Sequence, residues 1–178
     1  MEKDWNIVHI LSCARHDWLN QIQLIKGNMA LDRFDRVKEI IEEIIAEAGH
    51  ASRLTNTKLN SFAEYVMTYN WRNTPIQLEI EVLGDVKDLS SYDLALLTWT
   101  QAFIHMLETN IDGTSTHHVS VSLFMESDSI RFFFDFSGIL TTSQSIENWL
   151  EENEEQWPFK LIEKHIAKEE FHVVLELV

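Results

Sequence analysis

Two consecutive segments with the apolar spacing of long helices constrain the fold of this chain more than any other feature of its sequence. Over residues 4–29 and 33–55, apolar side chains recur at alternating steps of three and four, as in helices that pack side by side. In the first segment they are Val8, Leu11, Trp18, Ile22, Ile25 and Met29, with Arg15 at the one polar position. In the second they are Phe34, Val37, Ile41, Ile44, Ala48 and Ala51, and Ile40 and Ile45 widen the stripe.

The short break between these segments predicts an antiparallel helical hairpin. Residues 30–32 interrupt the apolar pattern, and Asp32 is the candidate N-cap of the second helix. One hairpin cannot bury two broad apolar stripes by itself, so we expect two copies to dimerise into a four-helix bundle. The alternative is that the stripes pack against the C-terminal part of the same chain.

Beyond Pro75 the apolar pattern changes to the period of two that is typical of strands. We expect helices over residues 60–71, 90–110, 143–152 and 159–168, and strands over residues 76–82, 119–125, 130–136 and 171–178. Ser90 and Asp93 resemble a capping box for the helix over 90–110. The predicted fold class is α+β, with a helical hairpin over 1–57 and a β-α-β-β-α-β sandwich of one sheet under helices over 58–178.

The composition excludes several classes of protein. A net charge of −15 argues against general nucleic-acid binding, and Cys13, the one cysteine, allows no internal disulfide. No apolar run approaches the ~18 residues of a membrane span, and residues 1–10 do not resemble a signal peptide, so we expect a soluble, cytoplasmic protein.

The negative charge is unevenly placed along the chain. Residues 1–56 hold 7 Lys and Arg against 9 Asp and Glu, whereas residues 57–178 hold 7 against 20. An acidic or phosphorylated partner therefore meets less repulsion at the hairpin.

A stripe of small and uncharged polar residues follows a second face of the first predicted helix. Its members, at steps of four, four, three and four, are Ser12, His16, Asn20, Gln23 and Gly27. A neutral imidazole is a good nucleophile near neutral pH, and small neighbours let a partner bring a phosphoryl group in line with it. Arg15 can pair with the incoming charge, and Asp17 can hold the imidazole tautomer or take a proton.

An ordinary solvated helix surface has the same spacing, so the pattern alone leaves both interpretations open. The other histidines offer no stronger candidate: His105 lies on a mostly apolar predicted helix and is expected in the core, and His117 and His118 are adjacent at the entry to a strand. The sequence contains no HExxH motif and no His/Cys pairing with metal-ligand spacing. We therefore predict no metal site on this chain.

Several longer sequence features are more specific than the spacing. They are the pair His16-Asp17, Asn20 four residues after the histidine, and the runs 24–28, 34–37, 69–71, 81–84 and 87–93. With these features, residues 14–44 resemble the helical hairpin of the sporulation initiation phosphotransferase B family. They are also similar to the His-(Asp/Glu)-x-x-Asn segment of citrate- and dicarboxylate-sensing histidine kinases. The resemblance covers most of the chain and fades toward the C-terminus.

The resemblance implies a phosphorelay phosphotransferase that is a homodimer with one phosphorylatable histidine per hairpin. The implied phosphoryl acceptor is His16, supported by Arg15, Asp17 and Asn20. The implied docking surface consists of Ser12, Leu19, Gln23 and Gly27. The implied partners are a single-domain response regulator that donates the phosphoryl group and a sporulation transcription factor that accepts it. The regulator would bring Mg²⁺, and this chain would bind no cofactor.

The C-terminal part resembles a histidine-kinase ATP-binding domain that has lost its nucleotide loops. Asn110 stands as a remnant of the nucleotide-site asparagine, and the run Asp135-Phe136-Ser137-Gly138 has one glycine where two are needed. Residues 157–166 match the helix after the second loop, but the glycines before it are absent. Close approach of the backbone to phosphates requires glycine and free N–H groups, so we expect no kinase activity.

Three alternative functions remain open at this point. Because an acidic residue also follows the histidine in true kinases, Asp17 is compatible with a soluble histidine kinase whose ATP site is degenerate. A non-enzymatic dimeric adaptor would bind a response regulator and sequester it without forming a phosphorylated intermediate. A general dimerisation module would bind no regulator at all. ATP-dependent labelling and regulator binding distinguish these alternatives.

Overall fold

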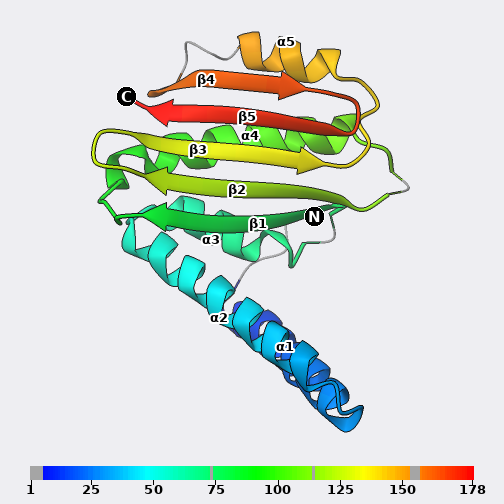
Figure 1. Cartoon of the computed structure of the whole chain (residues 1–178). Helices are drawn as coiled ribbons and strands as arrows, with labels where there is room; N and C mark the ends of the chain where they lie inside the picture. The colour runs from blue at the N-terminus through cyan, green and yellow to red at the C-terminus, as the bar shows by residue number, and fades with distance from the viewer. Residues whose placement is uncertain (1–5, 73, 114, 153–156) are drawn as a thin grey trace. The chain divides into compact units, whose positions relative to one another are not determined.

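The computed structural model of the chain describes residues 6–72, 74–113, 115–152 and 157–178. The chain divides into two compact units, one of residues up to Gly49 and one of residues His50–Val178. The first unit is helical, and the second contains a five-stranded mixed sheet with helices (Figure 1). The predicted α+β fold class is therefore confirmed. In the part of the chain that the structure describes, no helix has both the length and the apolar character required to cross a membrane.

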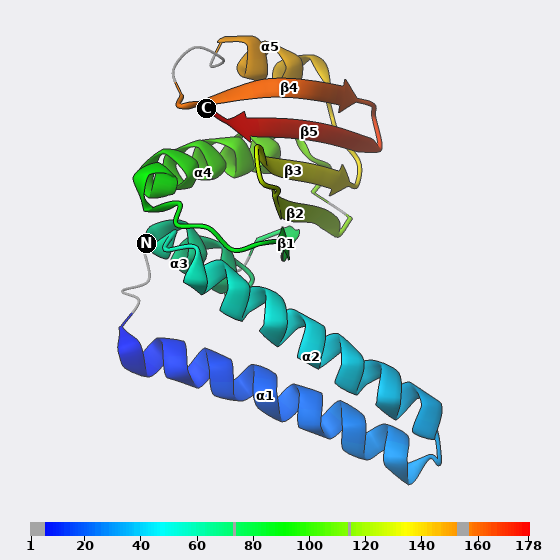
Figure 2. The same cartoon turned by 60° about the vertical axis from the view of Figure 1, so that its left-hand side comes forward.

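The first unit is a hairpin of α1 (Ile7–Ala30) and most of α2 (Phe34–Asn56) (Figure 2). The side chain of Asn6 caps α1 by accepting a hydrogen bond of 2.9 Å from the backbone N–H of His9. At the end of α1, the backbone N–H groups of Leu31 and Arg33 both donate to the carbonyl of Asn28. The predicted start of this helix at residue 4 lies outside the described residues.

The prediction that Asp32 caps α2 is wrong. Asp32 adopts a left-handed backbone conformation, with φ of 54°, in the turn that reverses the chain. The first helical hydrogen bond of α2 runs from the N–H of Val37 to the carbonyl of Arg33 at 3.1 Å, which places the cap one residue later. Aspartate tolerates the left-handed conformation better than most residues, so Asp32 serves the turn rather than the helix end.

The two helices of the hairpin do not pack through the predicted seam of α1. Val37 and Ile40 of α2 are buried, and Ile25 of α1 is half-buried. The other apolar members of the α1 seam are exposed, namely Val8, Leu11, Trp18, Ile22 and Met29. Val8 retains 77% of its accessible surface and Trp18 retains 58%, so a broad apolar strip of this hairpin faces solvent.

The second unit is built on one mixed sheet in the order β1-β2-β3-β5-β4. The strands are β1 (Ile76–Gly84), β2 (His117–Met125), β3 (Ile130–Ser137), β4 (Phe159–Ile166) and β5 (Glu170–Leu177). The helices are α3 (Asn60–Tyr69), α4 (Asp93–Asn110) and α5 (Gln144–Glu152), with a 3₁₀ turn at Ser90–Tyr92. Strands β1 and β2 are parallel and joined through α4, and the other strand pairs are antiparallel.

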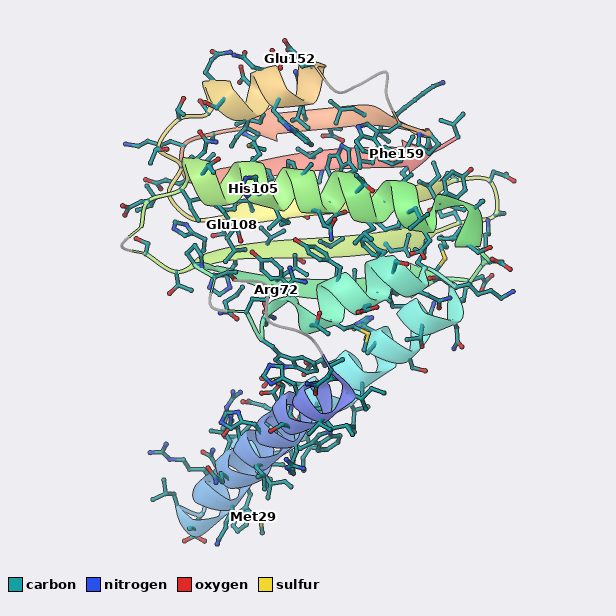
Figure 3. All side chains as sticks on the ribbon, turned by 180° about the vertical axis from the view of Figure 1, so that it is seen from behind. Met29, Arg72, His105, Glu108, Glu152 and Phe159 are labelled. Carbon is teal, nitrogen blue, oxygen red and sulfur yellow. The ribbon has the colours of Figure 1, made fainter. Side chains whose placement is uncertain are left out.

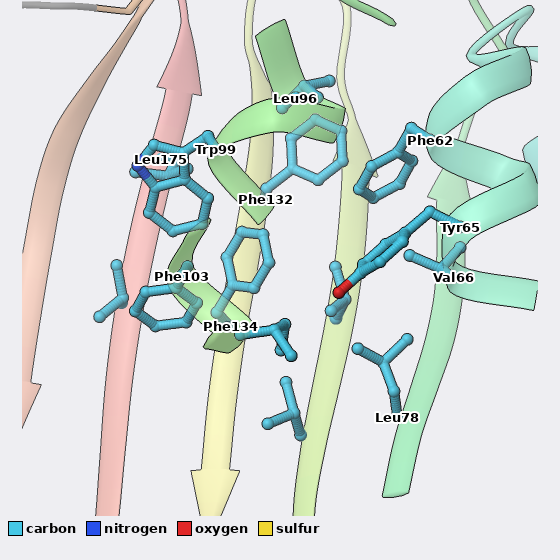
Figure 4. Close-up of a cluster of buried hydrophobic side chains, with 14 of the residues drawn as sticks. Phe62, Tyr65, Val66, Leu78, Leu96, Trp99, Phe103, Phe132, Phe134 and Leu175 are labelled. Atoms are coloured by element: carbon cyan, nitrogen blue, oxygen red, sulfur yellow. The ribbon is translucent and has the colours of Figure 1, made fainter. Parts of the chain in front are cut away.

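Aromatic side chains fill the space between the sheet and its helices (Figure 4). Phe132 of β3 meets Phe62 of α3 edge to face, with ring centroids 5.8 Å apart. Trp99 of α4 stacks on Phe103 at 4.7 Å and meets Trp149 of α5 at 5.7 Å. These contacts explain why the alternate residues of the central strands are apolar, since one face of the sheet is covered by helices.

The predicted helix over 159–168 is wrong, because β4 occupies residues Phe159–Ile166 and pairs antiparallel with β5. A tight turn, closed by the N–H of Ala167 and the carbonyl of Glu170 at 2.8 Å, joins the two strands. The register of this pair shifts between Leu161 and Glu163. The order of the C-terminal unit is therefore β-α-β-β-α-β-β, with one strand more than predicted.

The predicted capping box of Ser90 and Asp93 is also wrong. The cap residue of α4 is Tyr92, and no side chain bonds to that helix end. The carboxylate of Asp93 instead accepts the backbone N–H groups of Ser61 and Phe62, both at 2.9 Å. Asp93 therefore caps α3, an element more than thirty residues earlier in the chain, and ties α3 to the start of α4.

Side chains close the free edge of β1, which has a strand neighbour on one side only. The amide of Asn70 both donates to the carbonyl of Leu78 and accepts its N–H, each at 2.8 Å. Farther along, the N–H of Val82 donates to His50 at 3.1 Å, and Arg53 donates to the carbonyl of Val82 at 2.9 Å. These bonds satisfy backbone groups that would otherwise offer an edge for pairing with another chain.

Candidate functional site

His16 lies in the middle of α1, and its side chain is 72% exposed. Its Nδ1 atom is 3.1 Å from the amide nitrogen of Asn20, which is one helical turn away. The same atom is 3.6 Å from a carboxylate oxygen of Asp17. The structure therefore brings together three of the residues predicted for the site.

Both contacts engage Nδ1, so they determine which ring nitrogen of His16 carries the hydrogen. The amide nitrogen of Asn20, placed toward Nδ1, donates to it, and this contact favours the tautomer with hydrogen on Nε2. The carboxylate of Asp17 lies 3.6 Å from the same atom, beyond hydrogen-bond distance, and its negative charge favours the opposite tautomer, in which Nε2 has a free lone pair. The site can therefore present a nucleophilic nitrogen to solvent.

The remaining predicted site residues surround His16 on exposed parts of α1. Ser12, Arg15, Leu19 and Gln23 are all exposed. Gly27 is exposed as well, and a Cβ atom at this position would meet no heavy atom within 4 Å. All of these predicted residues are therefore accessible on the surface of α1.

In the C-terminal unit, the run Asp135–Gly138 is engaged in contacts within the fold. A carboxylate oxygen of Asp135 is 2.5 Å from Nδ1 of His172 on β5. The N–H of Gly138 donates to the carbonyl of Glu169 at 2.9 Å. Asn110 donates to the carbonyl of Met106 at 2.8 Å. These residues of the predicted nucleotide-site remnant are held by protein groups.

His117 has a structural role that the sequence did not indicate. Its ring is fully buried, accepts the N–H of Ile139 at Nδ1 and lies 2.7 Å from the carbonyl of Asp112 at Nε2. A Cβ atom on Gly138 would lie 2.2 Å from the same ring, so glycine is required there by close packing. The one glycine retained in this run thus makes room for a histidine.

The prediction that His105 belongs to the core is wrong, since its side chain is 79% exposed. Helix α4 is apolar over most of its circumference, but His105 falls on a narrow polar stripe with Gln101 and Glu108. Among the described residues, no group of three or more His, Cys, Asp or Glu side chains is arranged to hold a metal ion.

Two family models match consecutive parts of this chain. Residues 1–57 match the sensor kinase SpoOB-type alpha-helical domain, and residues 58–178 match the C-terminal domain of sporulation initiation phosphotransferase B. The chain belongs to the sporulation initiation phosphotransferase B family. The resemblance stated from the sequence is confirmed, and so is the assignment to a family of phosphotransferases.

Comparison with individual proteins gives the following similarities. The chain is 37% identical to sporulation initiation phosphotransferase B of Bacillus subtilis (strain 168) over 144 residues, which are 80% of this chain and 75% of the relative. It superposes on a bacterial phosphotransferase with a TM-score of 0.41 at 15% identity, covering 97% of this chain and 98% of the other. The histidine kinase ThkA, solved in complex with the response regulator TrrA, gives a TM-score of 0.44 at 13% identity, covering 95% of this chain but 60% of ThkA.

Proposed function

We propose that this protein relays a phosphoryl group in sporulation initiation, from the aspartyl phosphate of one response regulator to His16 and from His16 to a second regulator. The observation that carries the proposal is the exposed His16 imidazole, whose Nδ1 atom is approached by Asp17 and Asn20. Membership of the family supports it, and both transfers would take place in the cytosol. Mg²⁺ would belong to the regulator.

In the first transfer, Nε2 of His16 attacks the phosphorus atom while the bond from phosphorus to the regulator's aspartate oxygen breaks. The aspartate leaves as a carboxylate, and the hydrogen on Nδ1 stays in contact with Asp17, which stabilises the positive charge on the ring. Transition states of phosphoryl transfer are loose, so positioning and charge neutralisation provide most of the catalysis. Arg15, next to His16 in the chain, would offset the charge of the phosphoryl oxygens.

In the second transfer, an aspartate of the other regulator attacks the same phosphorus atom and the N–P bond breaks. The same face of α1 serves both partners, with Ser12, Leu19, Gln23 and Gly27 as the docking surface. Its small and uncharged residues fit the in-line approach that both steps require. Residues 1–56, with 7 basic and 9 acidic side chains, repel an acidic regulator far less than the remainder of the chain.

We also infer that the protein is a homodimer whose two hairpins form a four-helix bundle. The exposed apolar strip on α1, with Val8, Leu11, Trp18, Ile22 and Met29, supports this inference, because a lone hairpin leaves it in water. Ile41 and Ile45 add exposed apolar surface on α2. The strip lies on a different face of α1 from His16, so dimerisation leaves the histidine accessible.

The deciding experiment is phosphoryl transfer from a ³²P-labelled response regulator to the native chain, to His16→Gln and to the control His118→Gln, without ATP. His118 is exposed like His16 but lies on β2. We expect acid-labile, base-stable label on the native chain and the control, and none on His16→Gln. Label on none of the three chains, with the regulator still bound, would indicate the adaptor instead. In a separate incubation with ³²P-labelled ATP and no regulator, label on the native chain would indicate a kinase. Absence of regulator binding would indicate a dimerisation module.

A further inference from the structure

A cavity of about 380 Å³ lies in the C-terminal unit, and its lining includes neither Asn110 nor the run Asp135–Gly138. One wall is formed by Tyr65 and Tyr69 of α3 and by Arg72. The other wall is formed by one polar stripe of α4, with Gln101, His105 and Glu108. Figure 3 labels Arg72, His105 and Glu108 on this side of the unit. The volume falls within the range of about 300–1,000 Å³ that is typical of small-molecule sites.

Arg72 has a buried hydrogen-bond donor in this cavity that no protein group accepts. Its guanidinium carbon lies 4.9 Å from the ring centre of Tyr65 and 6.0 Å from that of Tyr69, so the cation rests against aromatic surface. Its Nε atom is buried and has no hydrogen-bond partner. Among the described residues, the guanidinium forms no hydrogen bond or ion pair. A buried donor without a partner is costly and rare, and a guanidinium fork matches a carboxylate.

The opposite wall offers an acceptor. One carboxylate oxygen of Glu108 accepts the hydroxyl of Tyr69 at 2.8 Å, and the other lies 3.8 Å from Nδ1 of His105. Burial raises the pKa of Tyr65 to about 12, although the nearby Arg72 acts in the opposite direction. The tyrosine wall is therefore neutral and largely apolar at physiological pH, between one cationic and one anionic group.

We propose that this cavity binds a small organic acid whose carboxylate lies beside a hydrogen-bond donor, as in α-amino and α-hydroxy acids. The carboxylate would meet the unpaired guanidinium of Arg72, the adjacent donor would meet Glu108, and the remainder would lie in the rest of the cavity. A phosphate fits less well, because a dianion would face Glu108 in a part of the chain where residues 57–178 hold 20 acidic and 7 basic side chains.

The alternative is that Arg72 has only a structural role. By stacking on the tyrosines, it would fix the connection between α3 and β1. That structural role predicts lower stability when Arg72 is replaced, and no binding of any small acid. The proposed site does not depend on phosphoryl transfer, because none of its residues belongs to the face around His16. Its test is therefore a binding measurement on the whole chain.

The probes are the twenty L-amino acids, L-lactate and L-malate, screened with the full chain by ligand-observed NMR, followed by calorimetric titration of each hit. We expect at least one probe to bind, and Arg72→Gln to weaken it by about tenfold or more through loss of charge-assisted hydrogen bonds. The control Arg131→Gln removes an arginine that pairs with Glu176 at 3.1 Å, outside the cavity. It should leave the affinity unchanged.

Matched analogues of each hit test the assignment of the two walls. The carboxamide analogue should lose binding to the native chain, because it no longer offers a carboxylate to Arg72. The analogue without the amine or hydroxyl should bind the native chain and Glu108→Gln equally, whereas the hit itself should bind Glu108→Gln more weakly. Circular dichroism confirms that each variant is folded. Absence of binding by every probe, or a hit whose affinity is the same for Arg72→Gln and the native chain, would overturn the proposal.

Discussion

At the scale of residues, the proposed role of His16 as phosphoryl acceptor would depend on two neighbours that approach the same ring nitrogen. Asn20 approaches Nδ1 at 3.1 Å and Asp17 approaches it at 3.6 Å. The amide contact, as placed, leaves hydrogen on Nε2, whereas the carboxylate contact leaves a lone pair there. The contact with Asp17 is therefore the productive one for attack on phosphorus, and the approach of a regulator would need to favour it.

This competition predicts different effects for two substitutions. Asp17→Ala removes the carboxylate that would select the reactive tautomer, so phosphoryl transfer to His16 should slow by about 10²-fold, in the range of lost acid–base assistance. Asn20→Ala removes the competing donor, so the transfer rate should fall far less. Rapid-quench measurement of label on His16 from a phosphorylated regulator gives both rates. Equal losses for the two variants would contradict a tautomer-selecting role for Asp17.

The residues of the site differ in how far the sequence predicts them. His16 and Asn20 come together because residues four apart lie one helical turn apart on the same face, and Asp17 lies near His16 as its direct neighbour in the chain, so their positions in the sequence were sufficient. The cavity was not predictable, because it joins Arg72, after α3, to Glu108 on α4, and only the fold brings these segments together. The sequence did carry one signal, since Gln101, His105 and Glu108 form a polar stripe on an apolar helix.

At the scale of elements, one glycine in each of the two long helices allows the effect of a substitution on regulator binding to be distinguished from its effect on helix stability. A Cβ atom on Gly27 of α1, or on Gly49 of α2, would meet no heavy atom within 4 Å. Alanine at either position should therefore stabilise its helix, by up to about 1 kcal/mol. Because Gly27 lies on the proposed docking surface, Gly27→Ala should also weaken regulator binding, whereas Gly49→Ala should not. Thermal unfolding and calorimetric titration with a regulator measure the two effects. Unchanged regulator affinity in Gly27→Ala would exclude Gly27 from the contact.

The elements that the sequence mispredicts have a common physical cause. Strand β4 lies at the edge of the sheet, and four consecutive residues, Ile162–His165, are exposed, so its apolar pattern is too sparse to show a period of two. Its strand character comes from pairing with β5, which local spacing does not report. Asp93 likewise caps α3 through space rather than its own helix. The central strands were predicted well, because burial of one face imposes strict alternation.

At the scale of the whole molecule, the exposed apolar strip on the hairpin is the feature that a single copy leaves unexplained. Ile45 of α2 is 65% exposed, yet it continues the apolar stripe that includes Ile41. Ala46 is also exposed, but it lies on the opposite side of α2 from the buried Val37. The two neighbours therefore provide a matched pair for testing whether this strip is covered by a second copy.

In the four-helix bundle, Ile45→Glu would bury a carboxylate at the contact between copies, whereas Ala46→Glu would place the same group in water. We expect Ile45→Glu to raise the dimer dissociation constant by about 100-fold or more, because an unpaired charge loses its hydration there. Ala46→Glu should dimerise like the native chain. Sedimentation velocity over a dilution series measures all three constants. A native chain that stays monomeric, or an Ile45→Glu chain that associates as tightly as Ala46→Glu, would contradict the proposed four-helix bundle.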